Sequence, residues 1–377
     1  MNLDDVVTQV AAAVGLAEGE SGIRDILAAV LTAEPSAVRE IARLAELPVP
    51  IVAAVGNELR ARGVLATQRP VQLTPAGRAA VAASVGLDLD PAAVATLSAP
   101  GGPLQAAADG APGAKTELDQ THCTVPTKLS RVLQLHEARA LAGQRILLLG
   151  DDDLIAVAVA HVLASAGRPG AVRRLTVVDT DADVLDWIRA QVSGTGVTVE
   201  AVQYDLREPL PADLTGAFDV VLTDPPYTVA GAELFLSRAV SALTAEPGRH
   251  VFFSFGARRP DETLAVQRAM AGMGLAIRSL RPGFNEYVGA GVLAGTSSLY
   301  HLRTAPGARP LIAGAYDGPL YSAANRAAVT RPYRCARCRT IQNVGPGSKW
   351  PQIAVLQAAG CPECGGTVFR PMPLVAR

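Results

Sequence analysis

The sequence predicts an α/β protein in which helices cover both faces of a parallel sheet. Five short apolar segments alternate with helical segments between about residues 118 and 305, namely RILLLG, RLTVVDT, VTVEAVQYD, FDVVLTD and RHVFFSF. Alternation of this kind is typical of a Rossmann-like sheet, in which a ligand lies beyond the carboxyl ends of the strands. A helical region before these segments and two cysteine pairs after them indicate two further units.

Length and composition bound the class of protein. The 377 residues suffice for two or three domains, about half are apolar, and the formal net charge is −1. The chain therefore has no overall basic character that would indicate nucleic acid as a partner. The N-terminus, MNLDDVVTQV, is acidic where a secretory signal is basic, and no run of about 18 apolar residues occurs. We therefore expect a cytoplasmic protein without a membrane span.

Residues 1–90 predict a winged-helix domain. In the stretch VREIARLAELPVPIVAAVGNELRARGVLATQRPVQLTPAGRAAV, helical periodicity breaks at Pro48 and Pro50, an alternating stretch follows, and a last helix starts at Thr74. The domain holds seven arginines and no lysine against eleven acidic residues, so its net charge is about −4. Because phosphate contacts need positive charge, a structural or dimerising role is favoured over contact with nucleic acid.

Composition also sets the next boundaries. The stretch VGLDLDPAAVATLSAPGGPLQAAADGAPGAKT is rich in Ala, Gly, Pro and Ser, which predicts a linker with little regular structure over residues 91–117. The α/β domain is then expected to span residues 118–330.

Acidic residues stand at or beside the ends of the first four predicted strands: Asp151 to Asp153, Asp179, Asp205 and Asp224. Because the carboxyl ends of parallel strands meet at one edge of the sheet, these residues predict a site there. Asp179, 29 residues after Gly150, can accept hydrogen bonds from both ribose hydroxyls of a nucleoside, and Asp205 from an adenine amino group. Helix capping is the alternative role for both.

The fourth strand leads into Thr223-Asp224-Pro225-Pro226-Tyr227-Thr228. Two prolines fix the backbone after the carboxylate, so that Asp224 is held rigidly. Methyltransferases of sp2 amino groups carry Asp/Asn-Pro-Pro-Tyr here, where the polar side chain and a proline carbonyl hold the amine and the aromatic ring packs against it. The motif therefore indicates group transfer from a sulfonium donor to nitrogen, although a proline-rich turn with a solvent-facing tyrosine is the alternative.

The first strand leads into Gly150-Asp151-Asp152-Asp153-Leu154, where a methyltransferase usually carries a glycine-rich turn. These carboxylates would repel a donor carboxylate by roughly a few kcal/mol if solvent is excluded. S-adenosylmethionine is therefore a poor match. Decarboxylated S-adenosylmethionine presents only an ammonium and a sulfonium, which suits the turn. The same cluster, together with Asp224, would attract a polycationic acceptor such as spermidine.

Taken together, these motifs resemble those of the branched-chain polyamine synthases, also called N4-bis(aminopropyl)spermidine synthases. The resemblance covers roughly residues 20 to 305. It implies a homodimeric aminopropyltransferase that uses decarboxylated S-adenosylmethionine, attacks through the secondary amine of spermidine and releases methylthioadenosine. The matching residues are GDDDL, DPPYT, Gly231, Phe235-Leu236-Ser237-Arg238, Asp119-Gln120, Phe284-Asn285-Glu286-Tyr287 and Gly295-Thr296-Ser297-Ser298.

The expected roles follow from the chemistry. Asp179 and Asp205 hold the adenosine part, while Gly150, Asp151, Asp152 and Asp153 form the turn that holds the donor's ammonium and the acceptor's flanking charges. The acceptor amine must lose a proton before it attacks, and either Asp153 or Asp224 takes that proton. Tyr227 shapes the acceptor site.

Three further side chains near these motifs have weaker support. Asp119 and Glu286 are candidates for the far ends of the acceptor, against the alternative of solvated loop carboxylates. His122 stands beside the lone Cys123, but no third group of a catalytic set is recognisable.

Four cysteines near the end form two C-x2-C pairs, Cys335-Ala-Arg-Cys338 and Cys361-Pro-Glu-Cys364, with 22 residues between the pairs. This spacing predicts a zinc ribbon over residues 331–377, in which four thiolates surround one structural Zn²⁺. A segment below about 50 residues needs such a metal to fold. The ribbon departs from the family pattern, and partner binding, covering of the active site and dimerisation are all open as its role.

The main alternative function is that of an S-adenosylmethionine-dependent methyltransferase acting on amino groups of nucleic acid or protein. DPPY, a helix-turn-helix and a zinc ribbon would all fit it. The aspartate turn, the acidic N-terminal domain and the lack of a basic stripe argue against it, so nucleic acid is an unlikely partner on this reading. A regulator that only senses a nucleoside would not need Asp-Pro-Pro-Tyr.

Overall fold

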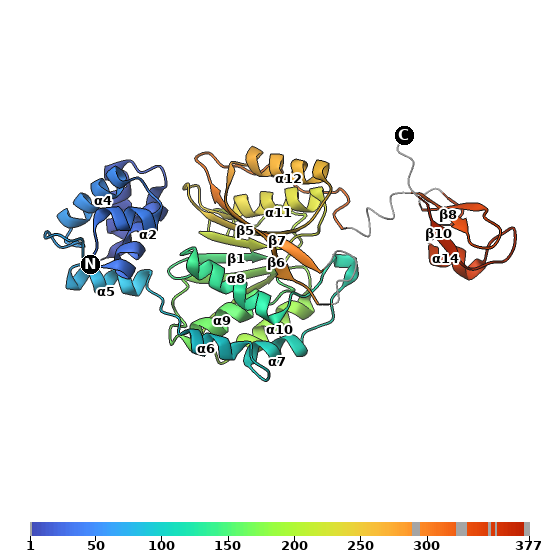
Figure 1. Ribbon diagram of the computed structural model, residues 1–377, viewed down its shortest axis with the longest axis horizontal. Coiled ribbons are helices and arrows are strands. Elements are labelled where there is room, and N and C mark those ends of the chain that lie inside the picture. Colours follow the sequence, from blue (N-terminus) through green and yellow to red (C-terminus); the bar gives the residue numbers. More distant parts are fainter. Residues whose placement is uncertain (1, 289–294, 322–329, 346–347, 351–352, 373–377) are drawn as a thin grey trace.

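A computed structural model describes residues 2–288, 295–321, 330–345, 348–350 and 353–372 (Figure 1). The predicted α/β class is confirmed, with a helical unit before the central sheet and a small three-stranded sheet after it. Residues 322–329, which precede the predicted boundary of the ribbon, lie outside the described residues. None of the described helices is long and apolar enough to cross a bilayer.

The N-terminal unit consists of five helices around its own apolar core. Between α4 and α5 the chain folds back through the isolated bridge Leu65–Leu73, and Val71 bridges to Ser36 before α3, an arrangement consistent with the predicted winged helix. An additional helix, α1, precedes the region in which the sequence pattern indicated helices. The elements are α1 (Leu3–Val14), α2 (Gly19–Ala33), α3 (Val38–Ala45), α4 (Val49–Ala61) and α5 (Pro75–Ser84).

The expectation of little regular structure in residues 91–117 is wrong. This segment contains α6 (Pro91–Leu97) and α7 (Pro103–Asp109), whose buried apolar side chains belong to the core of the α/β unit. Each helix has proline at its first position, and the Asp90 side chain accepts a bond from Ala92 N at 3.0 Å. Proline at a helix start and alanine within a helix give the same composition as a linker, so composition alone misled the prediction.

The central sheet has seven strands in the order β3-β2-β1-β4-β5-β7-β6. The first five are parallel and coincide with the five predicted segments, whereas β6 and β7 are antiparallel at one edge. The prediction of a parallel sheet was therefore right for β1 to β5 and incomplete beyond them. The strands are β1 (Arg145–Leu149), β2 (Arg174–Asp179), β3 (Glu200–Gln203), β4 (Val220–Thr223), β5 (His250–Gly256), β6 (Leu275–Glu286) and β7 (Thr296–Thr304).

Helices cover both faces of this sheet, as Figure 1 shows. Alternate strand residues point to opposite faces, so that Ile146 and Leu148 join one core with the first helix group, while Leu147 and Leu149 join a second core with the other. The first group is α8 (Val125–Glu137), α9 (Ile155–Ser165) and α10 (Ala182–Val192), together with α6 and α7. The second group is α11 (Val229–Ala242) and α12 (Pro260–Gly272).

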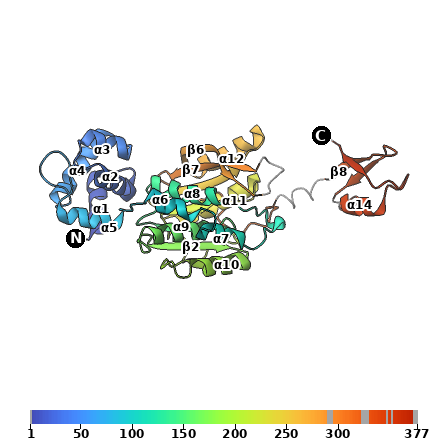
Figure 2. The ribbon, with the colours of Figure 1, turned by 60° about the horizontal axis from the view of Figure 1, so that its bottom comes forward.

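The N-terminal unit contacts the α/β unit at the amino-terminal ends of the strands. Asp4 pairs with Arg173, which directly precedes β2, and Ser21 donates to the carbonyl of Gly248, which precedes β5. Figure 2 shows these helices grouped at one side of the central sheet. The N-terminal unit therefore lies away from the carboxyl ends of the strands.

Arg238 of α11 fixes the segment that follows β7. The side chain is buried, and its guanidinium donates to backbone carbonyls on two loops. This segment, residues 305–321, runs along α11 as far as Leu320, whose carbonyl accepts a bond from Thr228 at 3.0 Å. The carbonyls bound by Arg238 are those of Leu206 at 2.9 Å, Arg207 at 3.0 Å, Ile312 at 2.8 Å and Gly314 at 2.7 Å.

The C-terminal sheet has the order β10-β8-β9 and is antiparallel. Its strands are β8 (Arg331–Cys335), β9 (Ile341–Val344) and β10 (Phe369–Pro371), and α14 (Ile353–Ala359) packs beside them. A small core of its own includes Trp350, Leu356 and Phe369.

We predict that Arg238→Met destabilises the protein substantially. Four carbonyls would lose a charged donor, and unsatisfied buried groups cost about 1–3 kcal/mol each, so a loss of about 3 kcal/mol, or roughly 6–10 °C in melting temperature, is expected. Differential scanning fluorimetry measures this shift. Arg259→Met is the matched control, since that side chain is 73% exposed and should change stability by less than about 0.5 kcal/mol. Equal melting temperatures for the two variants would contradict the role given to Arg238.

Candidate active site

The three aspartates after β1 point in different directions. Gly150, with φ +75°, begins the turn, and Leu154, with φ +55°, ends it directly before α9. A positive φ favours glycine, which explains why Gly150 is kept when the rest of the glycine-rich turn is replaced. The sharp turn between these two residues gives each aspartate a different environment.

Asp151 caps α9. Its Oδ1 accepts from Ile155 N at 2.7 Å and its Oδ2 from Ala156 N at 2.9 Å. The side chain is buried, and burial raises its pKa to about 8, although the two amides oppose this rise. Because both oxygens face the helix N-terminus, the structure gives Asp151 a positioning role in the turn.

Asp152 is directed toward open space at the strand ends. Its Oδ2 accepts a hydrogen bond from Thr121 N at 3.1 Å, and the residue lines both cavities described below. Burial, together with the neighbouring Asp153 and Asp224 carboxylates, raises the pKa of Asp152 well above its ordinary value. A cation bound beside Asp152 would lower that pKa again and stabilise the charged form.

Asp153 is buried and forms an ion pair with Arg131 of α8. Nη1 of Arg131 donates to Oδ2 at 2.7 Å, and the backbone N–H of Cys123 donates to Oδ1 at 2.5 Å. Burial would raise the pKa of Asp153, but the Arg131 and Lys128 cations hold it below its ordinary value. Asp153 is therefore a charged carboxylate with both oxygens bonded.

Asp224, directly after β4, binds the same guanidinium. Nη2 of Arg131 and the hydroxyl of Tyr287 both donate to Oδ2 of Asp224, at 2.7 and 2.5 Å. Burial raises the pKa of Asp224 above its ordinary value, although Arg131 opposes this. Among the described residues, none donates a hydrogen bond to Oδ1 of Asp224, so this oxygen can accept one from a bound molecule.

Tyr227 acts on Asp224 through one intervening hydroxyl. The Tyr227 hydroxyl donates to that of Tyr287 at 2.7 Å, and the two rings meet edge to face with centroids 6.4 Å apart. A Cβ at position 256 would lie 2.6 Å from the Tyr227 ring, so Gly256 is needed for the ring to occupy this place. The hydroxyls and Oδ2 of Asp224 thus form a short chain of hydrogen bonds.

The segment that contains His122 and Cys123 is held beside the end of β6 by an isolated antiparallel bridge between Cys123 and Tyr287. Thr124 N donates to Glu286 O at 2.8 Å, and Val288 N to His122 O at 2.9 Å. The His122 ring lies 2.7 Å from Asp152 O and 2.9 Å from Pro112 O, so it contacts backbone carbonyls on both sides. These contacts give His122 a structural role, and the Cys123 thiol is contacted instead by Lys128, whose Nζ lies 3.9 Å from Sγ.

The larger cavity lies at the ends of β1 to β4 and encloses about 570 Å³, part of it open solvent. Asp179 accepts from Asp151 N at 3.0 Å and Asp181 N at 2.9 Å, and Asp205 accepts from Arg207 N at 2.9 Å. These backbone bonds orient both carboxylates. The cavity is lined by Leu118, Asp119, Gln120, Gly150, Asp152, Val178, Asp179, Thr180, Tyr204, Asp205, Leu206, Asp224, Pro226, Phe235, Leu320 and Tyr321.

The smaller cavity lies between the sheet and α8, where the empty space, part of it open solvent, is about 400 Å³. Its apolar side is formed by Leu148, Leu222, Phe252 and Leu299, and its polar side by Arg131, the three aspartates of the turn and Asp224. Gly150, Asp152 and Asp224 line both cavities, so the cavities adjoin at these residues. Seven aspartates and one arginine line the two together, so the lining is acidic, although Asp151 caps α9 and Asp153 is paired with Arg131.

The two predicted residues for the far ends of an acceptor differ in position. Asp119 lines the larger cavity. Glu286 is exposed, and within the described residues it lines neither cavity. Strand alternation explains this, because Asn285 and Tyr287 on either side of Glu286 point into the hydrogen-bond network.

Arg131 and Lys128 were not predicted from the sequence, and Tyr287, which ends the matching stretch Phe284-Asn285-Glu286-Tyr287, was given no role there. Arg131 also donates from Nε to Asn285 at 2.8 Å, and Lys128 donates to the carbonyl of Asp153 at 2.7 Å. Both cations lie on α8 in PTKLSRVLQ, one helical turn apart, and both are buried. The sequence signal that could have revealed them is two cations one turn apart on the helix that precedes β1 and its acidic turn.

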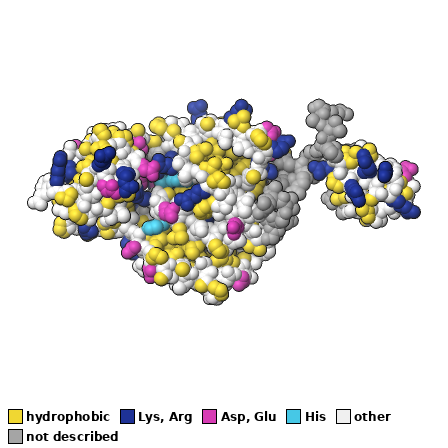
Figure 3. All heavy atoms as spheres, viewed as in Figure 1, with side chains coloured by type: hydrophobic (Ala, Val, Ile, Leu, Met, Phe, Trp, Pro, Cys, Tyr) yellow, Lys and Arg dark blue, Asp and Glu magenta, His cyan; other side chains and the backbone are white. Residues whose placement is uncertain are grey.

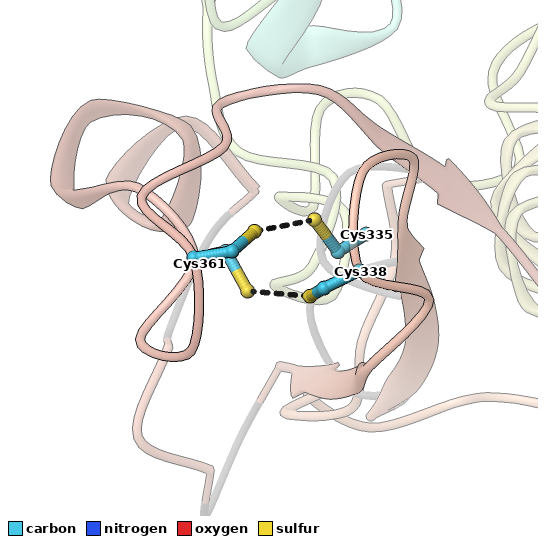
Figure 4. A group of neighbouring side chains, drawn as sticks. Cys335, Cys338 and Cys361 are labelled. Atoms are coloured by element: carbon cyan, nitrogen blue, oxygen red, sulfur yellow. Dashed lines mark hydrogen bonds between the residues drawn. The ribbon is translucent and has the colours of Figure 1, made fainter.

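The four C-terminal cysteines gather at one point, three of them labelled in Figure 4. Their Sγ atoms all lie within 4.8 Å of one another, with Cys335–Cys364 at 3.6 Å and Cys338–Cys361 at 3.5 Å. Four sulfurs at about 2.3 Å from a tetrahedral Zn²⁺ would be about 3.8 Å apart. The cluster therefore has the dimensions of a four-thiolate metal site.

Two relatives match most of the chain. An uncharacterized protein of Methanocaldococcus jannaschii is 31% identical over 382 residues, which cover 97% of this chain and 92% of that protein. Since so little of the chain lies outside this match, it extends into the cysteine-rich segment. The N(4)-bis(aminopropyl)spermidine synthase of the same organism is 28% identical over 287 residues, covering 72% of this chain and 79% of that enzyme.

A solved structure and a family model also match branched-chain polyamine synthases. The branched-chain polyamine synthase of Thermus thermophilus, in complex with N4-aminopropylspermidine and 5'-methylthioadenosine, superposes with a TM-score of 0.53 at 26% identity, covering 85% of this chain and 98% of that one. The family model for the branched-chain polyamine synthase A C-terminal domain matches residues 104–306, from α7 to the end of β7. This chain therefore belongs to the branched-chain polyamine synthase family.

Proposed function

We propose that the protein transfers an aminopropyl group from decarboxylated S-adenosylmethionine to the secondary amine of a polyamine such as spermidine. The observation that carries this proposal is the pair of adjoining cavities that share Asp152 and Asp224. One cavity suits a nucleoside and the other an alkyl amine, and the reacting groups would meet between them. The names of the relatives agree with this chemistry.

The larger cavity is suited to the donor. Asp179 and Asp205 offer carboxylates at the ends of β2 and β3 for ribose and adenine, and Phe235, Leu320 and Tyr321 offer apolar contacts for the base. Arg238 helps to form this cavity, because it holds both the loop after Asp205 and the segment that ends at Tyr321.

The smaller cavity is suited to a polyamine. Methylene groups can pack against the apolar side that Phe252 and Leu299 help to form, while ammonium groups face the acidic rim. A donor carboxylate would meet the same rim. Asp151 caps a helix and Asp153 pairs with Arg131, so repulsion of a carboxylate falls mainly to Asp152.

The reaction is a substitution at carbon. The acceptor nitrogen forms a bond to the aminopropyl carbon, the bond from that carbon to the sulfonium breaks, and sulfur keeps the electron pair in methylthioadenosine. A secondary ammonium must first lose its proton. Asp224 suits this step better than Asp153, because its Oδ1 has no donor among the described residues and its pKa is raised, whereas Asp153 is held charged by Arg131.

The remaining predicted residues have roles consistent with this arrangement. Tyr227 steadies Asp224 through Tyr287, and Asp119 faces the larger cavity from the loop before α8. We also propose that Cys335, Cys338, Cys361 and Cys364 hold a structural Zn²⁺, because all four sulfurs would be used and no open position would remain for catalysis.

The reaction predicts a specific pair of products. Purified protein given decarboxylated S-adenosylmethionine and spermidine should release methylthioadenosine together with a branched polyamine, detected by chromatography and mass spectrometry. Matched reactions with S-adenosylmethionine, and with nucleic acid as acceptor, should give little product. Adenosylhomocysteine as the only nucleoside product would overturn the proposal and favour a methyltransferase.

Asp224→Asn should lower kcat by about 10²–10⁴-fold, as expected for loss of a general base. In the wild type, kcat should rise with pH as Asp224 loses its proton, at a pH above the ordinary aspartate range because burial raises its pKa. The variant should lack this rise. Asp153→Asn should also lower kcat strongly, through loss of the Arg131 ion pair, but should keep the rise.

Asp213→Asn, at an exposed aspartate, is the control for these variants. Circular dichroism checks that each variant is folded. A wild-type rate in Asp224→Asn would remove Asp224 from the proton-accepting role.

Metal analysis should find about one zinc per chain. The double variant Cys361→Ser/Cys364→Ser should lose the metal and become sensitive to protease in the ribbon, whereas turnover persists because no described ribbon residue lines either cavity. Cys123→Ser should keep the metal. Zinc-free wild-type protein, freshly purified without chelator, would contradict the site.

A further inference from the structure

Positive charge is concentrated in the ribbon. Residues 331–377 hold seven lysines and arginines and one glutamate, a formal charge of +6, whereas the whole chain has −1. Four thiolates around a Zn²⁺ would contribute −2, so the ribbon keeps about +4. Residues 1–330 then carry −7. The near-zero net charge of the chain therefore hides a negative body and a positive ribbon.

The cations of the ribbon are exposed and have no carboxylate partner in the described chain. Every ion pair between described residues joins groups within residues 4–303, where most pairs use arginines of the body. Figure 3 shows Lys and Arg side chains spread over the visible face of the ribbon. The exposed cations are Arg331, Arg334, Arg337, Arg339, Lys349 and Arg370.

Two of these arginines lie directly opposite each other. Arg334 of β8 pairs in register with Arg370 of β10, while their neighbours Cys335 and Phe369 point inward and are buried. Side chains opposite each other in an antiparallel pair lie on the same face, about 5 Å apart at Cβ, and like charges there destabilise the sheet. Such a pair is stabilised when an anion lies between the two guanidinium groups.

The same face also exposes apolar side chains. Ile341, in register with Arg334, is 50% exposed, and Val368, two residues before Arg370, is 62% exposed. We call these four residues, Arg334, Ile341, Val368 and Arg370, the outer face of the ribbon. It combines two guanidinium groups with two apolar side chains, while Arg337 and Arg339 lie on the adjacent loop.

We propose that the outer face of the ribbon binds single-stranded nucleic acid. A single strand presents phosphates and unstacked bases together; the phosphates can pair with the guanidinium groups of this face, and the bases can stack on the guanidinium planes and contact the apolar side chains beside them. A duplex keeps its bases stacked inside and offers mainly phosphates to such a small surface, and the carboxylates of an acidic peptide bring no planar ring that could stack on the guanidinium groups of Arg334 and Arg370. The near-neutral charge of the whole chain indicated no such partner, because the acidic body cancels the ribbon.

The test is fluorescence anisotropy with the zinc-loaded full-length chain and labelled 15-nucleotide single strands of RNA and of DNA, without polyamine, at several salt concentrations. If four cations contact phosphates, log K should fall with log[salt] with a slope of about −3. Arg334→Gln/Arg370→Gln should weaken binding at least tenfold at low salt and make the slope shallower by about 1.4. Arg259→Gln/Arg268→Gln, directly before and within α12, removes the same charge from the body and should change neither the affinity nor the slope.

Three outcomes would overturn the proposal. The first is that the wild type does not bind at 50 mM salt, and the second is that the ribbon and α12 variants lose affinity equally. The third is that polyglutamate displaces RNA as effectively as unlabelled RNA does, which would favour an acidic protein surface as the partner. The relative affinities for RNA and DNA identify the preferred strand. Because binding is measured without turnover, and the ribbon variant should keep wild-type transferase activity, failure here is distinct from failure of the proposed reaction.

Discussion

The site depends on one buried ion-pair arrangement, in which the guanidinium of Arg131 lies between Asp153 and Asp224. Two buried carboxylates this close would otherwise repel each other, and one would take up a proton. Arg131 is itself oriented by Asn285, so a single helix residue fixes the end of β1, the end of β4 and the end of β6 relative to one another. The geometry of the strand ends therefore follows from α8 as much as from the sheet.

This arrangement divides the three consecutive aspartates among three tasks. Asp151 completes the hydrogen bonding of α9, Asp153 neutralises Arg131, and Asp152 keeps an oxygen directed toward the shared part of the cavities. Negative charge that is already paired attracts a cation only weakly. The selectivity that the GDDDL turn suggests thus rests mostly on Asp152 and on the unpaired oxygen of Asp224, a smaller set than the sequence motif indicates.

Much of the site was predictable from sequence because parallel strand ends meet in space. Asp152, Asp179, Asp205 and Asp224 all line the larger cavity as expected. Arg131 escaped prediction because helix periodicity indicates only which side chains are buried, and an arginine is not expected to be buried unless its partners are known. Glu286 was chosen in place of its neighbour Tyr287, a shift of one strand position that reverses the direction of the side chain.

The helices of residues 91–109 were missed since composition does not distinguish an alanine-rich helix that starts at proline from a linker.

The acidic active site offers a reason for the separation of a negative body from a positive ribbon. An active site lined by seven aspartates and one arginine attracts any mobile cation, including the chain's own arginines and lysines. In the body, most arginines are held by local carboxylates, as Arg145 and Arg174 are by Asp219 and Glu200, so they do not compete for the cavities. The ribbon cations lack such carboxylate partners. They can avoid inhibiting the enzyme in two ways: the ribbon stays away from the active site, or another anion binds to its cations. A polyanion bound to the outer face of the ribbon would satisfy the second condition, because it would neutralise these cations without any contact with the active site.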